Sequence, residues 1–147
     1  MDGEAHMPVV RPAGIHHIDL VVSSIERSLS FYRELLGPLG WHRVSEVEGE
    51  RGETIWYLSG AGCALGLRAA QSDSPPYDRY RVGFHHLCLE AASRAAVDER
   101  ADWLIEYGAE IETGPQEYAY IPGYYAVFFY DPDGMKLEIV HVPGQAA

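Results

Sequence analysis

The sequence contains one short motif twice: residues 14–20 read GIHHIDL, and residues 83–89 read GFHHLCL. In both copies apolar residues alternate around the second histidine, His17 or His86, which is typical of the start of a β-strand. A double-histidine strand that occurs twice in 147 residues indicates two copies of one small module. The duplication also places two imidazoles at equivalent positions, from which they could contribute to one metal site.

Composition is that of an ordinary soluble domain. Apolar residues make up 47% of the chain and charged residues 22%, which are normal values for one globular domain. No apolar run approaches the roughly 18 residues of a membrane span, and no signal peptide opens the chain, so we expect no membrane contact. Two cysteines without a Cys-x-x-Cys spacing favour a reducing compartment, the cytoplasm. The net charge of −11, without a basic stripe, argues against nucleic acid as a partner.

Both halves of the chain predict the same order of elements. In the first half, a strand over residues 15–22 leads into a helix with a capping-box spacing at Ser23 and Glu26, and a Gly-Pro pair stops it at residue 37. Three strands follow, at residues 41–47, 53–59 and 63–68.

The second half begins with a strand over residues 84–90 and a helix that starts at Ser93 and ends at Gly108. A short strand near Ile111, an aromatic segment and a closing hairpin complete it, and the hairpin turns at residues 131–134.

These patterns define two βαβββ modules within a single domain, residues 1–147. We expect module one at about residues 14–70, module two at about residues 83–142, and a polar, proline-rich linker at about residues 71–82. The predicted fold class is therefore α+β.

Strand alternation assigns the side chains to two faces, because residues two apart share a face. The aliphatic set around Leu20 is expected beneath the helix, which leaves His17 and Asp19 on the open side. The same reasoning places His86 on the open side of module two, together with Glu138 in the last strand. Two imidazoles and a carboxylate would then project into one cavity.

The element order, the repeated histidine and a closing Asp-Pro-Asp-Gly-x-x-x-Glu hairpin resemble the vicinal oxygen chelate superfamily, from about residue 14 to residue 142. This group includes glyoxalases, fosfomycin-modifying transferases, extradiol dioxygenases and bleomycin-resistance proteins. The resemblance implies that the modules pair into an eight-stranded, half-open mixed β cup with the helices outside. It also implies one divalent transition metal per site, Zn, Ni, Fe, Co or Mn, held by His17, His86 and Glu138.

Three positions depart from the patterns of particular subgroups. Many members of the superfamily carry a fourth ligand in module one, where this chain has Gly66. Extradiol dioxygenases have a catalytic tyrosine where this chain has Phe128, and fosfomycin transferases have a threonine where it has Asp19. We interpret Asp19 as the catalytic proton-transfer group, or as a carboxylate that orients a metal ligand.

Further residues are candidates for substrate binding. Arg68 lies on the open side and could hold an anionic group, and Tyr130 shares the face of Phe128. Tyr120 belongs to an aromatic segment, residues 118–125, that could form a wall for a planar substrate.

Three hypotheses for function remain open. The first is a metal-dependent lyase, isomerase or thiol-adding enzyme of the glyoxalase type, acting on a small oxygen-chelating substrate. The second is an iron-dependent, extradiol-type ring-cleaving dioxygenase. The third is a non-catalytic protein that sequesters a drug or metabolite. The resemblance also implies a homodimer, in which the two chains could exchange modules.

Overall fold

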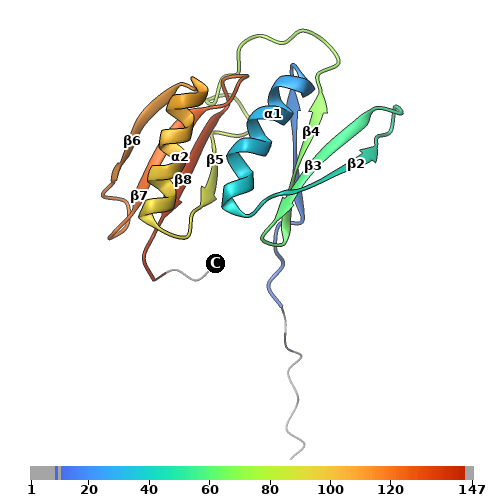
Figure 1. The fold of residues 1–147 in the computed structure, drawn as a ribbon. Helices are drawn as coiled ribbons and strands as arrows, with labels where there is room; N and C mark the ends of the chain where they lie inside the picture. The colour runs from blue at the N-terminus through green and yellow to red at the C-terminus, as the bar shows by residue number, and fades with distance from the viewer. Residues whose placement is uncertain (1–8, 10, 145–147) are drawn as a thin grey trace, which may run out of the picture.

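The computed structural model of the protein describes residue 9 and residues 11–144. Each half contains one α-helix and four strands in the order β-α-β-β-β (Figure 1). The first half consists of β1 (His17–Val22), α1 (Ile25–Leu36), β2 (Arg43–Glu48), β3 (Thr54–Gly60) and β4 (Cys63–Ala69), with a 3-10 turn after the helix (Gly37–Leu39). The second consists of β5 (Leu87–Glu90), α2 (Arg94–Tyr107), β6 (Ile111–Glu117), β7 (Tyr125–Tyr130) and β8 (Lys136–His141). None of the helices in these residues is long and apolar enough to cross a membrane.

The strands form two four-stranded mixed sheets of matching topology. Their orders are β1-β4-β3-β2 and β5-β8-β7-β6, and in each sheet only the first pair is parallel. Within residues 11–144, no strand pair joins one sheet to the other. The prediction of an α+β fold built from two βαβββ modules, without a closed barrel, is confirmed.

Helix α1 begins one residue later than the capping-box pattern predicts. Ser24 has the extended backbone of an N-cap, and its hydroxyl accepts a hydrogen bond from the amide of Arg27 at 3.2 Å. Ser23 instead donates its backbone N–H to Asp133, in the β7–β8 turn of module two. The first serine is therefore used to join the modules, and the second caps the helix.

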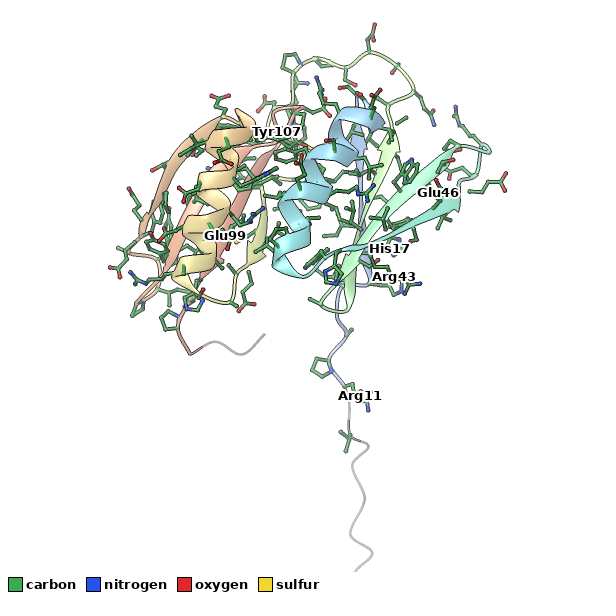
Figure 2. The ribbon with its side chains drawn as sticks, viewed as in Figure 1. Arg11, His17, Arg43, Glu46, Glu99 and Tyr107 are labelled. Carbon is green, nitrogen blue, oxygen red and sulfur yellow. The ribbon has the colours of Figure 1, made fainter. Side chains whose placement is uncertain are left out.

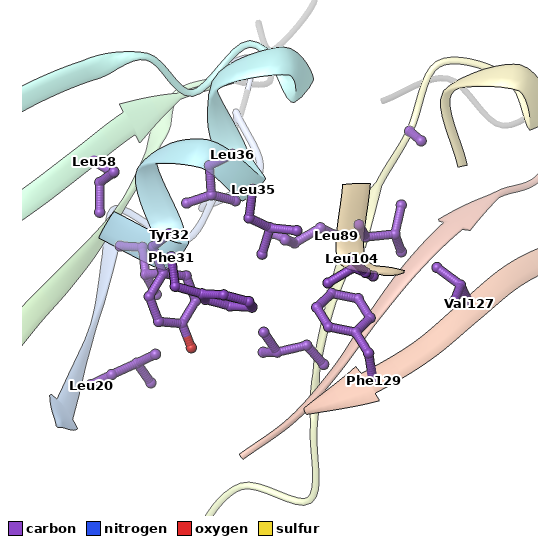
Figure 3. Packing of buried hydrophobic residues seen from close by; sticks show 14 of the residues in the cluster. Leu20, Phe31, Tyr32, Leu35, Leu36, Leu58, Leu89, Leu104, Val127 and Phe129 are labelled. Carbon is purple, nitrogen blue, oxygen red and sulfur yellow. The ribbon is translucent and has the colours of Figure 1, made fainter. Parts of the chain in front are cut away.

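The two helices pack against each other, so that one apolar core extends through both modules (Figure 3). The Phe31 and Trp103 ring centroids lie 5.6 Å apart. Arg100, only 5% exposed, donates from Nη1 to the carbonyl of Glu34 at 2.8 Å, near the end of α1. A guanidinium at this position satisfies a carbonyl that the helix itself leaves unpaired. Each helix covers one face of its own sheet, and we call the other face of each sheet the helix-free face.

The β7–β8 turn fastens module two to the start of α1. Tyr32 donates its hydroxyl to Asp131 Oδ2 at 2.7 Å, and Asp131 Oδ1 accepts the amides of Asp133 and Met135, each at 2.9 Å. Arg27 adds an ion pair to Asp133 at 3.1 Å. The turn thus fixes its own shape and holds the two modules in one arrangement.

Asp131 provides a test of this contact. Replacing Asp131 with Ala should lower the free energy of unfolding by about 2 kcal/mol, because a buried hydroxyl and two amides lose their acceptor. Asp131→Asn should cost less, because the amide oxygen can accept the same backbone donors. Burial raises the pKa of Asp131 despite the hydrogen bond from Tyr32, so the stability that this carboxyl contributes is lost as the pH rises through the raised pKa. Urea unfolding at several pH values should show that the free energy of unfolding of the wild type, measured relative to that of Asp131→Asn, falls as the pH rises through this range.

Candidate metal and substrate site

His86 and Glu138 meet on the helix-free face of the second sheet. Glu138 is central in β8 and pairs in register with Cys88 of β5. This register brings Glu138 beside His86, which directly precedes β5. His86 Nε2 lies 3.0 Å from Glu138 Oε1, and the Glu138 side chain is only 2% exposed. The structure therefore joins two of the three predicted ligands within one module.

Tyr124 holds the other oxygen of the same carboxylate. Its hydroxyl donates to Glu138 Oε2, and burial, together with this hydrogen bond, raises the pKa of Tyr124 above its usual range. Sequence reasoning placed Tyr124 in an aromatic wall and missed this contact. Tyr124 lies in the loop before β7, where strand alternation gives no direction for a side chain. The one local signal was Gly123, the residue before Tyr124, because glycine allows the backbone to turn sharply, here at φ 78°.

His17 lies in the other sheet, at the start of β1, where Figure 2 labels it near the entry of the N-terminal segment. Its ring stands edge-on to Tyr57, with centroids 5.6 Å apart. Among the residues that the structure describes, no group of three His, Cys, Asp or Glu side chains could hold a metal ion. One chain by itself therefore does not bring His17 together with His86 and Glu138.

The paired histidines have the same local geometry in both modules. His16 Nδ1 lies 2.8 Å from His17 Nδ1, and His85 Nδ1 lies 2.8 Å from His86 Nδ1. In each pair one Nδ1 must donate and the other accept. Such a contact uses Nδ1 of the second histidine and leaves its Nε2 as the nitrogen that could bind a metal, and in His86 this Nε2 lies 3.0 Å from Glu138 Oε1.

Asp19 and Tyr57 occupy the space next to Gly66. Tyr57 Oη donates to Asp19 Oδ2 at 3.1 Å, and Arg68 Nε donates to the same oxygen at 2.8 Å. Asp19 Oδ1 is buried and has no hydrogen-bond partner among the described residues. A Cβ atom added at Gly66 would lie 2.2 Å from Asp19 Oδ1 and 2.5 Å from Tyr57 Cε1. The chain thus has no room for a larger residue at the position where related proteins carry a fourth ligand.

This crowding predicts the outcome of adding a methyl group. Gly66→Ala should lower the free energy of unfolding by about 1–3 kcal/mol, because the Cβ atom displaces the Asp19 carboxylate. Gly37→Ala is the matched control, since a Cβ there meets nothing within 4 Å. The double variant Asp19→Ala, Gly66→Ala should lose less than the sum of its single variants. Strict additivity in denaturant unfolding would contradict the contact.

Arg68 is surrounded by carboxylates of its own chain. It lies 2.8 Å from Asp19, 2.9 Å from Glu50 and 3.7 Å from Glu53. Hydrogen bonds to Glu50 and Asp19 raise the pKa of Arg68. Its charge is therefore already compensated, which reduces its attraction for an anionic group of a substrate.

The remaining candidates lie on the helix-free face of the second sheet. Phe128, which is 7% exposed, places its ring centroid 6.1 Å from that of His86. Tyr120 is 68% exposed and stacks on Tyr118 with centroids 5.7 Å apart. Tyr130, the last residue of β7, donates its hydroxyl to Glu112 of β6. An aromatic surface thus surrounds the His86–Glu138 pair.

Cys88 shares this face but is not activated as a nucleophile. Burial of the sulfur and the negative charge of Glu138 raise the pKa of the Cys88 thiol to about 12, although the residue as a whole is exposed. The thiol is therefore neutral at physiological pH.

The chain matches a family model described as the glyoxalase/bleomycin resistance protein/dioxygenase superfamily over residues 14–139. It belongs to that superfamily. A Bacillus subtilis relative, the uncharacterized protein YqjT, is 32% identical over 127 residues, covering 86% of this chain and 97% of the relative. The metallothiol transferase FosB of Shouchella clausii is 28% identical over 128 residues, covering 86% of this chain and 78% of FosB.

A solved structure from Bacillus halodurans shares 31% identity and superposes with a TM-score of 0.72, covering 87% of this chain and 95% of that one. The likeness extends over both modules, so the arrangement of strands and helices is that of the superfamily. Superfamily membership establishes the fold, while the chemistry depends on the residues of the helix-free faces.

Proposed function

We propose that this protein is a divalent-metal-dependent enzyme that acts on a small substrate carrying adjacent oxygen atoms. His17, His86 and Glu138 would hold the metal. The observation that carries the proposal is Glu138, a carboxylate only 2% exposed that is held by His86 and Tyr124. Burying a carboxylate is costly unless a cation or strong donors compensate it, so residues of this kind are concentrated at functional sites.

The donor set suits a transition metal. Two neutral imidazoles and one carboxylate are typical ligands of Zn²⁺, Ni²⁺, Fe²⁺, Co²⁺ or Mn²⁺, and three protein ligands leave coordination positions for a substrate. The Nδ1 contacts of both histidine pairs and the hydroxyl of Tyr124 orient the ligands in advance. The site is thus supported on all three ligands by neighbouring side chains.

We further propose that two chains build each site. His17 belongs to the first sheet, and His86 and Glu138 belong to the second, on the opposite side of a shared helical core. In a homodimer with exchanged modules, the first sheet of one protomer would face the second sheet of its partner. Each cup would then take His17 from one chain, and His86 and Glu138 from the other.

When bound, the metal acts as a Lewis acid that stabilises negative charge on the oxygens of the substrate. Asp19 follows His17 on the same face of β1, and we assign the proton transfer to its carboxylate, whose Oδ1 is buried and has no hydrogen-bond partner among the described residues. Arg68 and Tyr57 hold its other oxygen and so fix its direction.

Among the possible reactions, we favour addition of a thiol. The relative FosB is by name a metallothiol transferase, at 28% identity. In this reaction the thiol would come from a second substrate. Glyoxalase-like isomerisation uses the same metal and the same proton-transfer group, and is the alternative within this class.

Two assays test the proposal. Protein purified without chelator should retain a divalent metal, and the metal-loaded protein should consume a small thiol in the presence of an oxygen-chelating electrophile. Oxygen uptake with a panel of catechols under Fe²⁺ would instead support ring cleavage, which lacks its tyrosine at Phe128. Failure to bind any divalent metal would contradict the proposal and favour a protein that only sequesters a ligand.

A further inference from the structure

A cationic cluster lies beside the His86–Glu138 pair on the same helix-free face. Lys136 precedes Glu138 by two residues on β8, and its Nζ lies 4.8 Å from the centroid of the Phe128 ring. The centroid of the same ring lies 6.1 Å from that of the His86 ring. The lysine is therefore a neighbour of the proposed metal site.

Arg79 joins this cluster from the segment between the modules. Its guanidinium carbon lies 5.2 Å from the centroid of Tyr80 and 5.9 Å from that of Tyr130. Its Nη1 donates to Tyr130 Oη at 3.3 Å, and its Nε is buried without a partner in the described part of the chain. Contacts with aromatic faces hold a guanidinium in place without using its N–H donors. Because Nε is buried, the donors that Arg79 keeps for a ligand are the Nη N–H groups that Tyr130 does not use.

The balance of charge distinguishes this cluster from that around Arg68. Lys136 and Arg79 share one carboxylate, Glu112, at 2.9 Å and 3.6 Å. Arg68 alone faces three carboxylates within 4 Å. Among the described residues, Glu112 is thus the one carboxylate within 4 Å of these two cations, whereas Glu138 is engaged by His86 and Tyr124, and two cations that share one carboxylate attract a further anion. Glu112 also accepts the hydroxyl of Tyr130, so it holds Tyr130 and Lys136 in fixed positions.

We propose that Arg79 and Lys136 form a subsite for an oxyanionic group of the substrate: a phosphate, phosphonate or carboxylate. This proposal rests on the proposed function, because it assigns the oxyanionic group to the substrate that would bind at His86 and Glu138. A planar guanidinium can donate two parallel hydrogen bonds to an oxyanion, and the ammonium adds a point charge. The substrate would therefore carry an anionic end beside Phe128 and adjacent oxygens at the metal.

The test uses the full chain without metal and follows its amide resonances during titration with inorganic phosphate, methylphosphonate or acetate. Saturable shifts should appear around Arg79, Tyr130 and Lys136. Arg79→Gln and Lys136→Gln should each weaken phosphate binding by about tenfold, because each removes a charged hydrogen-bond donor. Arg81→Gln is the matched control, since Arg81 lies in the same segment, 68% exposed and paired with Asp78. Its phosphate affinity should match that of the wild type.

Equal phosphate affinity of wild type, Arg79→Gln and Lys136→Gln would overturn the subsite, as would shifts centred on Arg68 or the absence of saturation. The wild-type shift map does not depend on how the variants fold. Stronger binding of phosphate and methylphosphonate than of acetate would assign a tetrahedral oxyanion, and the reverse order would assign a carboxylate. These titrations use no metal, so they are independent of the metal-binding assay. If the wild-type protein binds phosphate but no divalent metal, the proposed function is contradicted and the subsite stands.

Discussion

Glu138→Gln is expected to lower the affinity for a divalent metal by on the order of 10- to 100-fold or more. Glutamine has almost the same shape as glutamate and can still accept the hydroxyl of Tyr124, but it removes the only anionic ligand of the proposed set. Competition with a chromogenic chelator measures the change. The metal-free variant should be as stable as the wild type, because a buried negative charge has been removed rather than created.

Glu90→Gln is the matched control for that substitution. Glu90 lies two residues beyond Cys88 on the short strand β5, is exposed, and loses the same charge. Its metal affinity should stay within about twofold of the wild type, because a screened surface charge contributes little. Unchanged metal retention in Glu138→Gln, or an equal loss in both variants, would mean that the ligand set is wrong.

Local signals in the sequence were sufficient for the two modules. Alternation around His17 and His86, capping serines before both helices and the turn at residues 131–134 each depend on neighbouring residues only. Such signals predict elements and the faces of strands well. They place Glu138 on the open face of its strand, which is the helix-free face in the structure.

The arrangement of the two sheets depended on contacts that no local pattern encodes. Packing of Phe31 against Trp103, and of Arg100 on the end of α1, sets how the modules meet. Alternation tells which side chains share a face of one strand, but it does not tell which sheet lies opposite. For this reason the sequence predicted three ligands in one cavity, whereas one chain joins only His86 and Glu138.

Side-chain partners were also beyond sequence reasoning. Arg68 looked available for a substrate because its strand position points to the open side, yet Glu50 and Glu53 approach it from the turn between β2 and β3. Arg79 gave no signal at all, because the linker has no periodicity. The contrast between these two arginines follows from the three-dimensional distribution of carboxylates.

Complementation between two defective chains is expected to have an all-or-none effect. A chain with His17→Ala lacks the metal ligand of its first module and keeps both ligands of its second module. A chain with His86→Ala keeps His17 but lacks one of the two ligands of its second module. In a dimer with exchanged modules, a mixed pair contains one cup with both substitutions and one cup with neither. The intact cup takes His17 from the His86→Ala chain, and His86 and Glu138 from the His17→Ala chain.

The decisive measurement is the metal content of that mixed dimer, isolated by co-expressing the two chains with different affinity tags and purifying on both. We expect about one tightly bound metal per mixed dimer, and none in either parent dimer, because each parent lacks one ligand in every cup. A mixed dimer that holds no more metal than its parents would contradict a site shared between two chains, and with it the proposed origin of the activity.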